Sequence, residues 1–169
     1  MLLIANENPY VSGEEAMFEE LIRAGEEKSS FTLPFSLRNF LISCLIEHQH
    51  DPDIVHCVLA LDFLQSSLTS GAERAVALKR AGDASLILAG FFPERALRLN
   101  VSSFYFRLME QSFYGSLAAH LESGPSPEIG KFYNTVADVF PALELVLRNA
   151  RGKAQDEWSA FRRFRAQLN

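Results

Sequence analysis

Apolar side chains recur at helical spacing along almost the whole chain, and this periodicity is the feature that most constrains its fold. Between Gly13 and Glu27, for example, Phe18, Leu21 and Ile22 fall on one side of a helix. Apolar and polar residues alternate as in a strand only within the first five residues, and no repeat of constant period is present. The pattern predicts an all-α fold, with residues 1–169 forming a single domain built as a bundle of about seven helices.

Capping and helix-breaking residues divide the chain into expected helices. We expect them at residues 13–27, 35–48, 52–64, 72–92, 102–121, 128–149 and 154–168. Gly82 leaves open whether 72–92 is one kinked helix or two, and Asp83 would cap the second of two. Pro141 predicts a kink or a break near Phe140, because proline removes a backbone donor and clashes with the preceding turn.

Composition is that of an ordinary globular domain, with 48% hydrophobic and 22% charged residues, so we expect the whole chain to fold. Cys44 and Cys57 lie in apolar helical runs, and we interpret both as reduced, buried side chains. The N-terminus lacks the basic start of a signal peptide. The longest strongly apolar stretch, residues 84–92, is less than half of the ~20 residues that span a bilayer. These features predict a cytoplasmic protein with no transmembrane segment.

Charge is distributed unevenly along the chain, whose formal net charge is −5. Residues 1–29 are rich in glutamate, whereas residues 148–169 are rich in arginine and lysine. The basic end could bind nucleic acid, an anionic membrane or a partner protein. It could equally be a terminal helix whose solvated face complements the acidic end. Because an acidic protein repels phosphate backbones at long range, we expect no nucleic acid partner.

Three short stretches stand out within residues 80–114: Arg80-Ala-Gly-Asp83, the run from Leu86 to Gly90-Phe-Phe-Pro93, and Ser102-Ser-Phe-Tyr105 followed by Met109 and Tyr114. Together they resemble a GDxxLxxxGFFP-type segment of uncharacterised bacterial all-helical proteins, with Glu110 where that pattern has glycine. The resemblance implies a bacterial, intracellular origin. No activity is established for those proteins, so the resemblance implies no catalytic role.

The densest polar cluster in the sequence runs from Glu47 to Asp53 and continues to His56 and Cys57. Its candidate metal ligands are His48, His50, Asp51 and His56. His48 and His50 would lie about 200° apart on a helix, and no HExxH or CxxC spacing occurs. His50-Asp51 is similar to the dipeptide of HD-type phosphohydrolases, which need a further upstream histidine, and no histidine precedes His48. We therefore favour a solvated interhelical turn and predict no metal and no cofactor.

A second candidate site combines the aromatic residues of 91–92, 104–106 and 113–114 with nearby arginines. Its candidate ligand-binding residues are Asp83, Arg95, Arg98, Tyr105, Arg107 and Tyr114. Arginine and aromatic rings can bind an anionic or planar ligand, although core packing explains the same spacing. Asp83 and Glu110 could also act as paired carboxylates in acid–base chemistry, but a helix cap is the simpler role for Asp83.

Motifs for nucleophilic catalysis and phosphate binding are absent from the sequence, which contains no GxSxG elbow, GxGxxG loop or Walker loop. We therefore predict a cytoplasmic regulatory or accessory module that acts through protein contacts, with a protein partner or as a homodimer. The alternative is a helical enzyme or sensor that binds a small ligand or a metal, using the segment Gly82–Pro93 and the aromatic helix 102–121.

Overall fold

The computed structural model describes residues 13–51, 69–93 and 103–157, apart from the side chains of 103–107, 109–110 and 152–157. These residues form helices and no strands, which confirms the all-α prediction. The helices are α1 (Gly13–Ser29), α2 (Phe35–His48), α4 (Gly71–Phe91), α6 (Ser103–Glu122), α7 (Pro127–Asp138) and α8 (Phe140–Glu157). Six helices are thus described where we expected about seven, and the helix expected at 52–64 lies outside the described residues. Residues 128–149 divide between α7 and α8, and the break expected between residues 149 and 154 is wrong, because α8 runs through it to Glu157.

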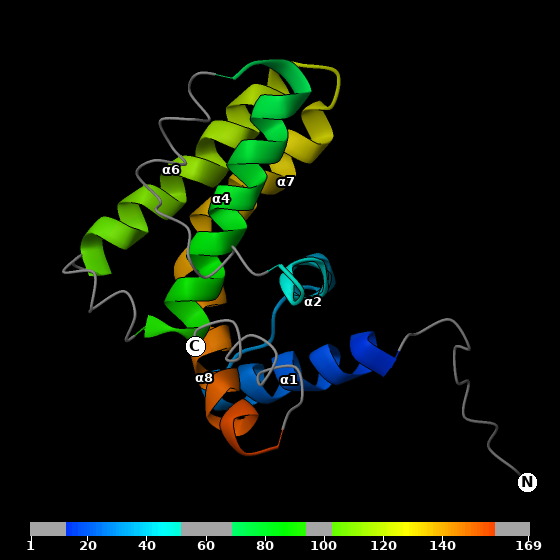
Figure 1. Cartoon of the computed structure of the whole chain (residues 1–169), viewed down its shortest axis with the longest axis vertical. Helices are drawn as coiled ribbons and strands as arrows, with labels where there is room; N and C mark the ends of the chain where they lie inside the picture. The colour runs from blue at the N-terminus through cyan, green and yellow to red at the C-terminus, as the bar shows by residue number, and fades with distance from the viewer. Residues whose placement is uncertain (1–12, 52–68, 94–102, 158–169) are drawn as a thin grey trace, which may run out of the picture.

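In Figure 1, α4, α6 and α7 lie in the upper part of the molecule, and α1 and α2 lie below them. Helix α4 packs against both α6 and α8, and α6 packs along α7. In the lower part α1 crosses α8, and α2 lies against α1. This arrangement brings the acidic N-terminal helix next to the helix in which the basic C-terminal part of the chain begins.

Proline and glycine act differently at the two predicted breaks. The chain does divide near Phe140, since α7 ends at Asp138 and α8 begins at Phe140 with Pro141 in its first turn. A proline there is tolerated because its missing N–H would have no partner inside the helix. Helix α4, in contrast, runs without interruption through Gly82.

Gly82 is therefore a packing residue rather than a helix end, and the capping role expected for Asp83 is wrong. A Cβ atom on Gly82 would lie 2.7 Å from the ring of Tyr114 on α6, so only glycine lets the two helices approach this closely. Gly90 is similar, because a Cβ atom there would overlap Leu147 on α8. Without a break at Gly82, Asp83 lies in the middle of α4 and is fully buried.

The second half of α4 is the centre of the hydrophobic core, because every residue from Ala81 to Phe91 is buried. A helix that is buried on all sides needs partners all round, and α6 and α8 supply two of them. Cys44 on α2 is buried in this core, as expected, whereas Cys57 lies outside the described residues. Large core side chains come from five helices: Phe18, Leu21, Leu41, Leu45, Phe91, Phe113, Tyr114 and Phe140.

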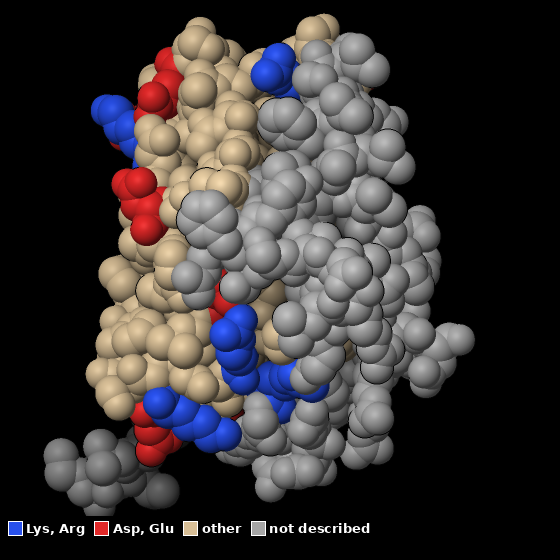
Figure 2. Space-filling view, turned by 90° about the vertical axis from the view of Figure 1, so that its left-hand side faces the viewer, with Lys and Arg blue, Asp and Glu red and all other residues tan. Residues whose placement is uncertain are grey.

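The surface of the described residues carries both signs of charge. Figure 2 shows basic and acidic side chains in small groups on one face, with neither sign covering it. Among residues 13–51, 69–93 and 103–157, no helix is both long enough and apolar enough to cross a membrane.

Candidate functional site

A fully buried carboxylate, Asp83, lies at the centre of a polar network inside the core. Its Oδ2 atom accepts hydrogen bonds from Lys79 Nζ at 2.7 Å and from His48 Nε2 at 2.8 Å. Its Oδ1 atom accepts one from the hydroxyl of Tyr114, also at 2.7 Å. A buried carboxylate is stable only when its oxygens are satisfied in this way. Asp83 therefore connects α2, α4 and α6 through polar contacts.

Helical periodicity explains why these side chains meet. Cys44 and His48 are four residues apart on α2, and Lys79 and Asp83 are four residues apart on α4, so each pair shares one face of its helix. Tyr114 reaches Asp83 from α6 across the gap left by Gly82. The network thus combines two short local spacings with one close helix contact.

A second layer of charged groups surrounds the network. Lys79 Nζ lies 2.7 Å from Glu47 Oε2 as well as from Asp83, so its ammonium group bridges two carboxylates. The other ring nitrogen of His48, Nδ1, faces Asp51 Oδ2 at 3.8 Å. Arg80 in turn holds Asp51, with 2.9 Å between Nη2 and Oδ2. Each carboxylate around the cluster therefore has a cationic neighbour.

The Cys44 thiol is protonated in this environment and is no activated nucleophile. Burial raises its pKa well above the ordinary value, and the negative charge of Asp83 acts in the same direction, while Lys79 opposes both. His48 directs Nε2 to Asp83, so it does not act as a base for the thiol. A reactive cysteine needs the opposite arrangement, with a lowered pKa. This arrangement therefore does not support cysteine–histidine catalysis.

The neighbouring lysine and tyrosines keep their protons as well. Burial lowers the pKa of Lys79, but the charge of Asp83 and the hydrogen bonds to Asp83 and Glu47 outweigh it, so the pKa is raised overall. Burial and the charge of Asp83 raise the pKa of Tyr114 well above its ordinary value. Burial also raises the pKa of Tyr133 to about 12, against the lowering effect of Lys79. The cluster consequently holds several hydrogen-bond donors around Asp83, and the Cys44 thiol, which is hydrogen-bonded to Asp83, is one of them.

Three of these side chains present metal-ligand atoms close together. The sulfur of Cys44, a ring nitrogen of His48 and a carboxylate oxygen of Asp83 all lie within 4.8 Å of one another, and all three residues are buried. Around a tetrahedral zinc ion with bonds of about 2.0–2.3 Å, ligand atoms are roughly 3.3–3.7 Å apart. The bonded pair, His48 Nε2 and Asp83 Oδ2, is 2.8 Å apart, so a small outward shift would make room for the ion. Thiolate, imidazole and carboxylate together are a donor set typical of zinc.

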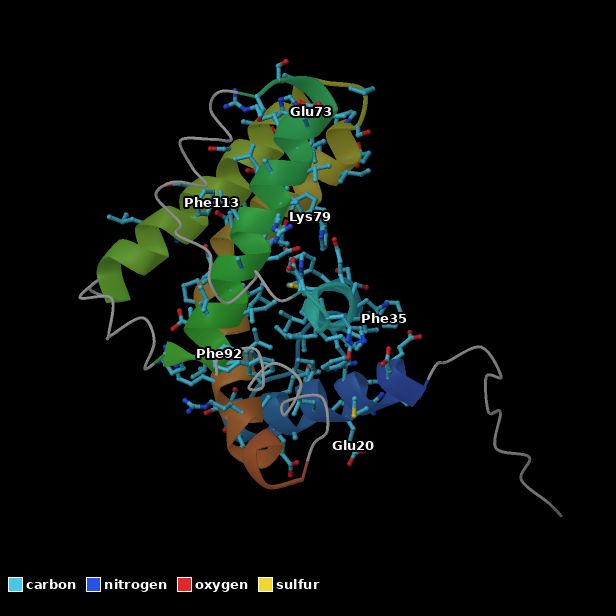
Figure 3. All side chains as sticks on the ribbon, viewed as in Figure 1. Glu20, Phe35, Glu73, Lys79, Phe92 and Phe113 are labelled. Carbon is cyan, nitrogen blue, oxygen red and sulfur yellow. The ribbon has the colours of Figure 1, made fainter. Side chains whose placement is uncertain are left out.

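A pocket of about 240 Å³ opens beside the cluster, between α2, α4 and α7. Cys44 and Lys79 line the pocket and are both hydrogen-bonded to Asp83, so the pocket borders the buried cluster. Figure 3 shows Lys79 on the side of α4 that faces α2. The complete lining consists of Ser36, Asn39, Phe40, Ser43, Cys44, Glu47, Lys79, Phe132 and Tyr133.

The structure unites some of the candidates from the sequence and separates others. His48, Asp83 and Tyr114, which belonged to two different candidate sites, contact one another in a single network. Asp51 lies in its outer layer, whereas the side chain of His50 is 66% exposed and points to Glu14.

The remaining candidates fall outside what the structure describes. Arg95, Arg98 and His56 are outside the described residues, so their proposed roles stay predictions. Tyr105, Arg107 and Glu110 belong to α6, but their side chains are not described.

Cys44 and Lys79 were missed as site residues. Cys44 was interpreted only as a core side chain, and Lys79 was not singled out. The signals that could have found them are the four-residue spacings of Cys44 to His48 and of Lys79 to Asp83.

Comparison of the chain with protein-family models, with curated proteins and with solved structures gives no match. The candidate site therefore rests on its own geometry, and the resemblance of residues 80–114 to bacterial helical proteins stays a prediction.

Proposed function

We propose that this protein binds one zinc ion, or a chemically similar divalent metal, through Cys44, His48 and Asp83. The observation that carries the proposal is the convergence of these three donor atoms within 4.8 Å in the core. It corresponds to the metal-binding form of the enzyme or sensor considered from the sequence, but with a different set of ligands.

Charge balance supports a divalent ion at this position. Metal binding would displace the proton of the Cys44 thiol, and the resulting thiolate together with the Asp83 carboxylate would neutralise a dication. Lys79 now supplies the positive charge next to Asp83, and it has a second partner in Glu47 at 2.7 Å. The ammonium group can therefore give up Asp83 without losing its other ion pair.

Neighbouring side chains are placed to orient two of the three ligands. Tyr114 bonds to Oδ1 of Asp83, which holds the carboxylate with Oδ2 toward His48 and the metal position. Asp51 lies 3.8 Å from Nδ1 of His48, where a small closing movement would let its carboxylate accept a hydrogen bond from Nδ1–H while Nε2 binds the metal. Such partners of the ligands fix the histidine tautomer and strengthen metal binding.

Cobalt substitution tests the proposal, because Co²⁺ replaces zinc and its visible spectrum reports coordination. Titration of metal-free protein with Co²⁺ should give tetrahedral bands and a thiolate-to-cobalt charge-transfer band at one equivalent. Cys44→Ser should abolish the charge-transfer band. The control His50→Gln changes an exposed histidine nearby and should leave the spectrum intact.

Folded protein that gives no such spectrum with Co²⁺, and that retains no stoichiometric zinc after gel filtration, would overturn the proposal. Circular dichroism of the same samples confirms that the Cys44→Ser chain is folded, so loss of the band reports loss of the ligand.

The interaction module predicted from the sequence stays a prediction, as do its partner and its homodimer. Among the side chains that the structure describes, the large exposed apolar ones occur singly on five helices rather than on one: Phe35, Val76, Leu108, Ile129 and Leu145. Single exposed apolar residues are normal on a soluble surface, so they support no particular docking face.

A further inference from the structure

We infer that the metal keeps one coordination position open toward the pocket between α2, α4 and α7, where it binds a small ligand through an anionic oxygen, such as a carboxylate or hydroxamate. This inference rests on the proposed function. The metal centre would then be of the catalytic type, with one exchangeable ligand position, rather than a structural centre closed by four protein ligands.

The number of donors is the first argument. Structural zinc sites are closed by four protein ligands, whereas catalytic sites have three protein ligands and an exchangeable fourth position. Within the part of the chain that the structure describes, the group that could hold an ion contains three donors: Cys44, His48 and Asp83. A tetrahedral ion bound there therefore needs one further ligand.

The position of the pocket is the second argument. The thiol-bearing residue Cys44 lines the pocket, although its side chain is buried, and Lys79 lines it from α4. Tyr114 packs behind Asp83 in the core, with its ring stacked on Tyr133 at a centroid distance of 5.9 Å. The core side of the metal position is therefore filled, and the pocket is the side from which a fourth ligand can enter.

The wall of the pocket suits a small ligand with one polar end. Phe40, Phe132 and Tyr133 form an aromatic side, with edge contacts between Phe40 and each of the other two rings. Lys79 and the protonated hydroxyl of Tyr133 are donors for a ligand oxygen. The volume of about 240 Å³ lies below the ~300–1,000 Å³ of drug-sized sites, so a small acid fits the pocket better than a nucleotide or a peptide.

Glu47 is the side chain that could close the site instead. It lines the pocket, and its Oε1 atom is 4.0 Å from Nε2 of His48. Its Oε2 atom, however, is engaged by Lys79 at 2.7 Å. Because Lys79 loses Asp83 as a partner when the metal binds, its pairing with Glu47 becomes more important, and this keeps the carboxylate off the metal.

Acetohydroxamate is a suitable probe, because it binds an open zinc or cobalt position through its anionic oxygen. Titration of cobalt-loaded protein with acetohydroxamate should shift the visible bands with saturation at one equivalent. Ser43→Leu, which projects into the pocket from α2, should weaken acetohydroxamate binding by about tenfold or more and leave the cobalt stoichiometry unchanged. Ser112→Leu makes the same chemical change at an exposed position on α6 and serves as the matched control.

Each outcome separates this inference from the proposed function. Failure to bind cobalt refutes the metal site itself. A cobalt spectrum that acetohydroxamate leaves unchanged refutes only the open position. If Glu47→Gln alters the cobalt spectrum without added ligand, Glu47 is the fourth ligand and the inference is wrong. Equal binding by the Ser43→Leu and Ser112→Leu proteins places the probe outside the pocket and also overturns it.

Discussion

Two buried carboxylates, Glu26 on α1 and Asp83 on α4, are satisfied by different kinds of partner. The Glu26 carboxylate accepts a hydrogen bond from the backbone N–H of Leu33 at 2.9 Å. It accepts two more from the guanidinium of Arg38, at 3.0 and 3.1 Å. A guanidinium keeps its proton and binds a carboxylate as a rigid fork, so this arrangement has no exchangeable member. Asp83 is instead bonded by an amine, an imidazole and a phenol, with a thiol close by. Burial of a carboxylate is common to both regions, and the chemistry of its partners distinguishes a structural link from the proposed binding site.

Both carboxylates follow a glycine that allows close helix packing. A Cβ atom on Gly25 would overlap the backbone carbonyl of Val146 on α8, and a Cβ atom on Gly82 would overlap the ring of Tyr114. The neighbour of Gly25 is therefore rigid main chain, whereas the neighbour of Gly82 is itself a member of the polar network. In both regions a glycine allows close packing: Gly25 lets α1 approach α8, and Gly82 lets α4 approach Tyr114 of the candidate site.

The strongest way to separate the two regions is to remove each carboxylate. Asp83→Ala should lower the free energy of unfolding by about 3–5 kcal/mol, because the buried donors of His48 and Tyr114 lose their common acceptor. Glu26→Ala should cost a comparable amount, since Arg38 loses its partner. Urea denaturation followed by circular dichroism measures both.

Zinc then distinguishes the two variants. At a free zinc concentration of 100 times Kd, wild-type and Glu26→Ala proteins should each gain about 2.7 kcal/mol, whereas Asp83→Ala should gain nothing. Equal stabilisation of both variants by zinc would remove Asp83 from the ligand set. Loss of the zinc effect in Glu26→Ala would mean that the two carboxylates do not differ in function.

Adding a methyl group to each glycine is a milder form of the same comparison. Gly82→Ala should destabilise the protein by about 1–3 kcal/mol and weaken metal binding, because Tyr114 must move away from Asp83. Gly25→Ala should cost at least as much, since the Val146 carbonyl belongs to a helix backbone, but should leave metal affinity unchanged. Thermal unfolding with and without Co²⁺ measures both effects, and unchanged metal affinity in Gly82→Ala would show that Tyr114 does not orient the ligand.

The sequence predicted most helix boundaries, because these depend on local signals, but the break expected between residues 149 and 154 is wrong, since α8 continues to Glu157. The limits of 35–48 and the break at Pro141 follow from nearby prolines and from apolar periodicity, and the structure confirms both. The role of Gly82 was not accessible in this way, since a glycine that ends a helix and a glycine that admits a neighbouring ring look alike in one sequence. The residue that fills the space beside Gly82 is Tyr114, which belongs to α6, so the role of this glycine depends on tertiary packing.

The candidate site was predicted only in fragments, for a related reason. His48 belonged to one candidate site and Asp83 and Tyr114 to another. Their convergence depends on how α2, α4 and α6 pack, which periodicity does not specify. The search for metal ligands followed the polar run after Glu47 and passed over Cys44, whose apolar neighbours predicted a core residue. That prediction is correct, and the same side chain also faces His48 and Asp83.

Lys79 provides a third, smaller test, because its ammonium group lies 2.7 Å from the Asp83 oxygen that would bind the proposed metal. Lys79→Met should tighten zinc or cobalt binding by about tenfold, since a competing positive charge a few ångströms away is removed. The same change should destabilise the metal-free protein, which loses the ion pair with Asp83. Competition with a chromophoric chelator measures the affinity, and Lys131→Met, which alters an exposed lysine on α7, is the control.

Weaker metal binding by Lys79→Met than by Lys131→Met would contradict this assignment. It would show that the ammonium group supports the metal site, for example by holding Glu47 in place, rather than competing with the ion.

The smallest expected effect concerns the metal-free protein at alkaline pH. Burial raises the pKa of the Cys44 thiol in the folded state, so the folded protein keeps a proton that the unfolded chain loses above about pH 8.5. Folding stability is therefore fully present below that pH and decreases as pH rises, by up to about 1.4 kcal/mol per unit for one proton. Tyr114 and Lys79, whose pKa values are also raised, add to the decrease above about pH 10.

Cys44→Ser removes the first of these contributions and should flatten the decline between about pH 8.5 and 10, whereas Glu26→Gln should leave its slope unchanged. Urea denaturation across this range measures the slopes. Parallel profiles for wild-type and Cys44→Ser proteins would mean that the thiol is not held protonated beside Asp83. The thiol would then not distinguish the Asp83 region from the Glu26 region, and the two would differ in the proposed metal affinity and in the raised pKa values of Lys79 and Tyr114.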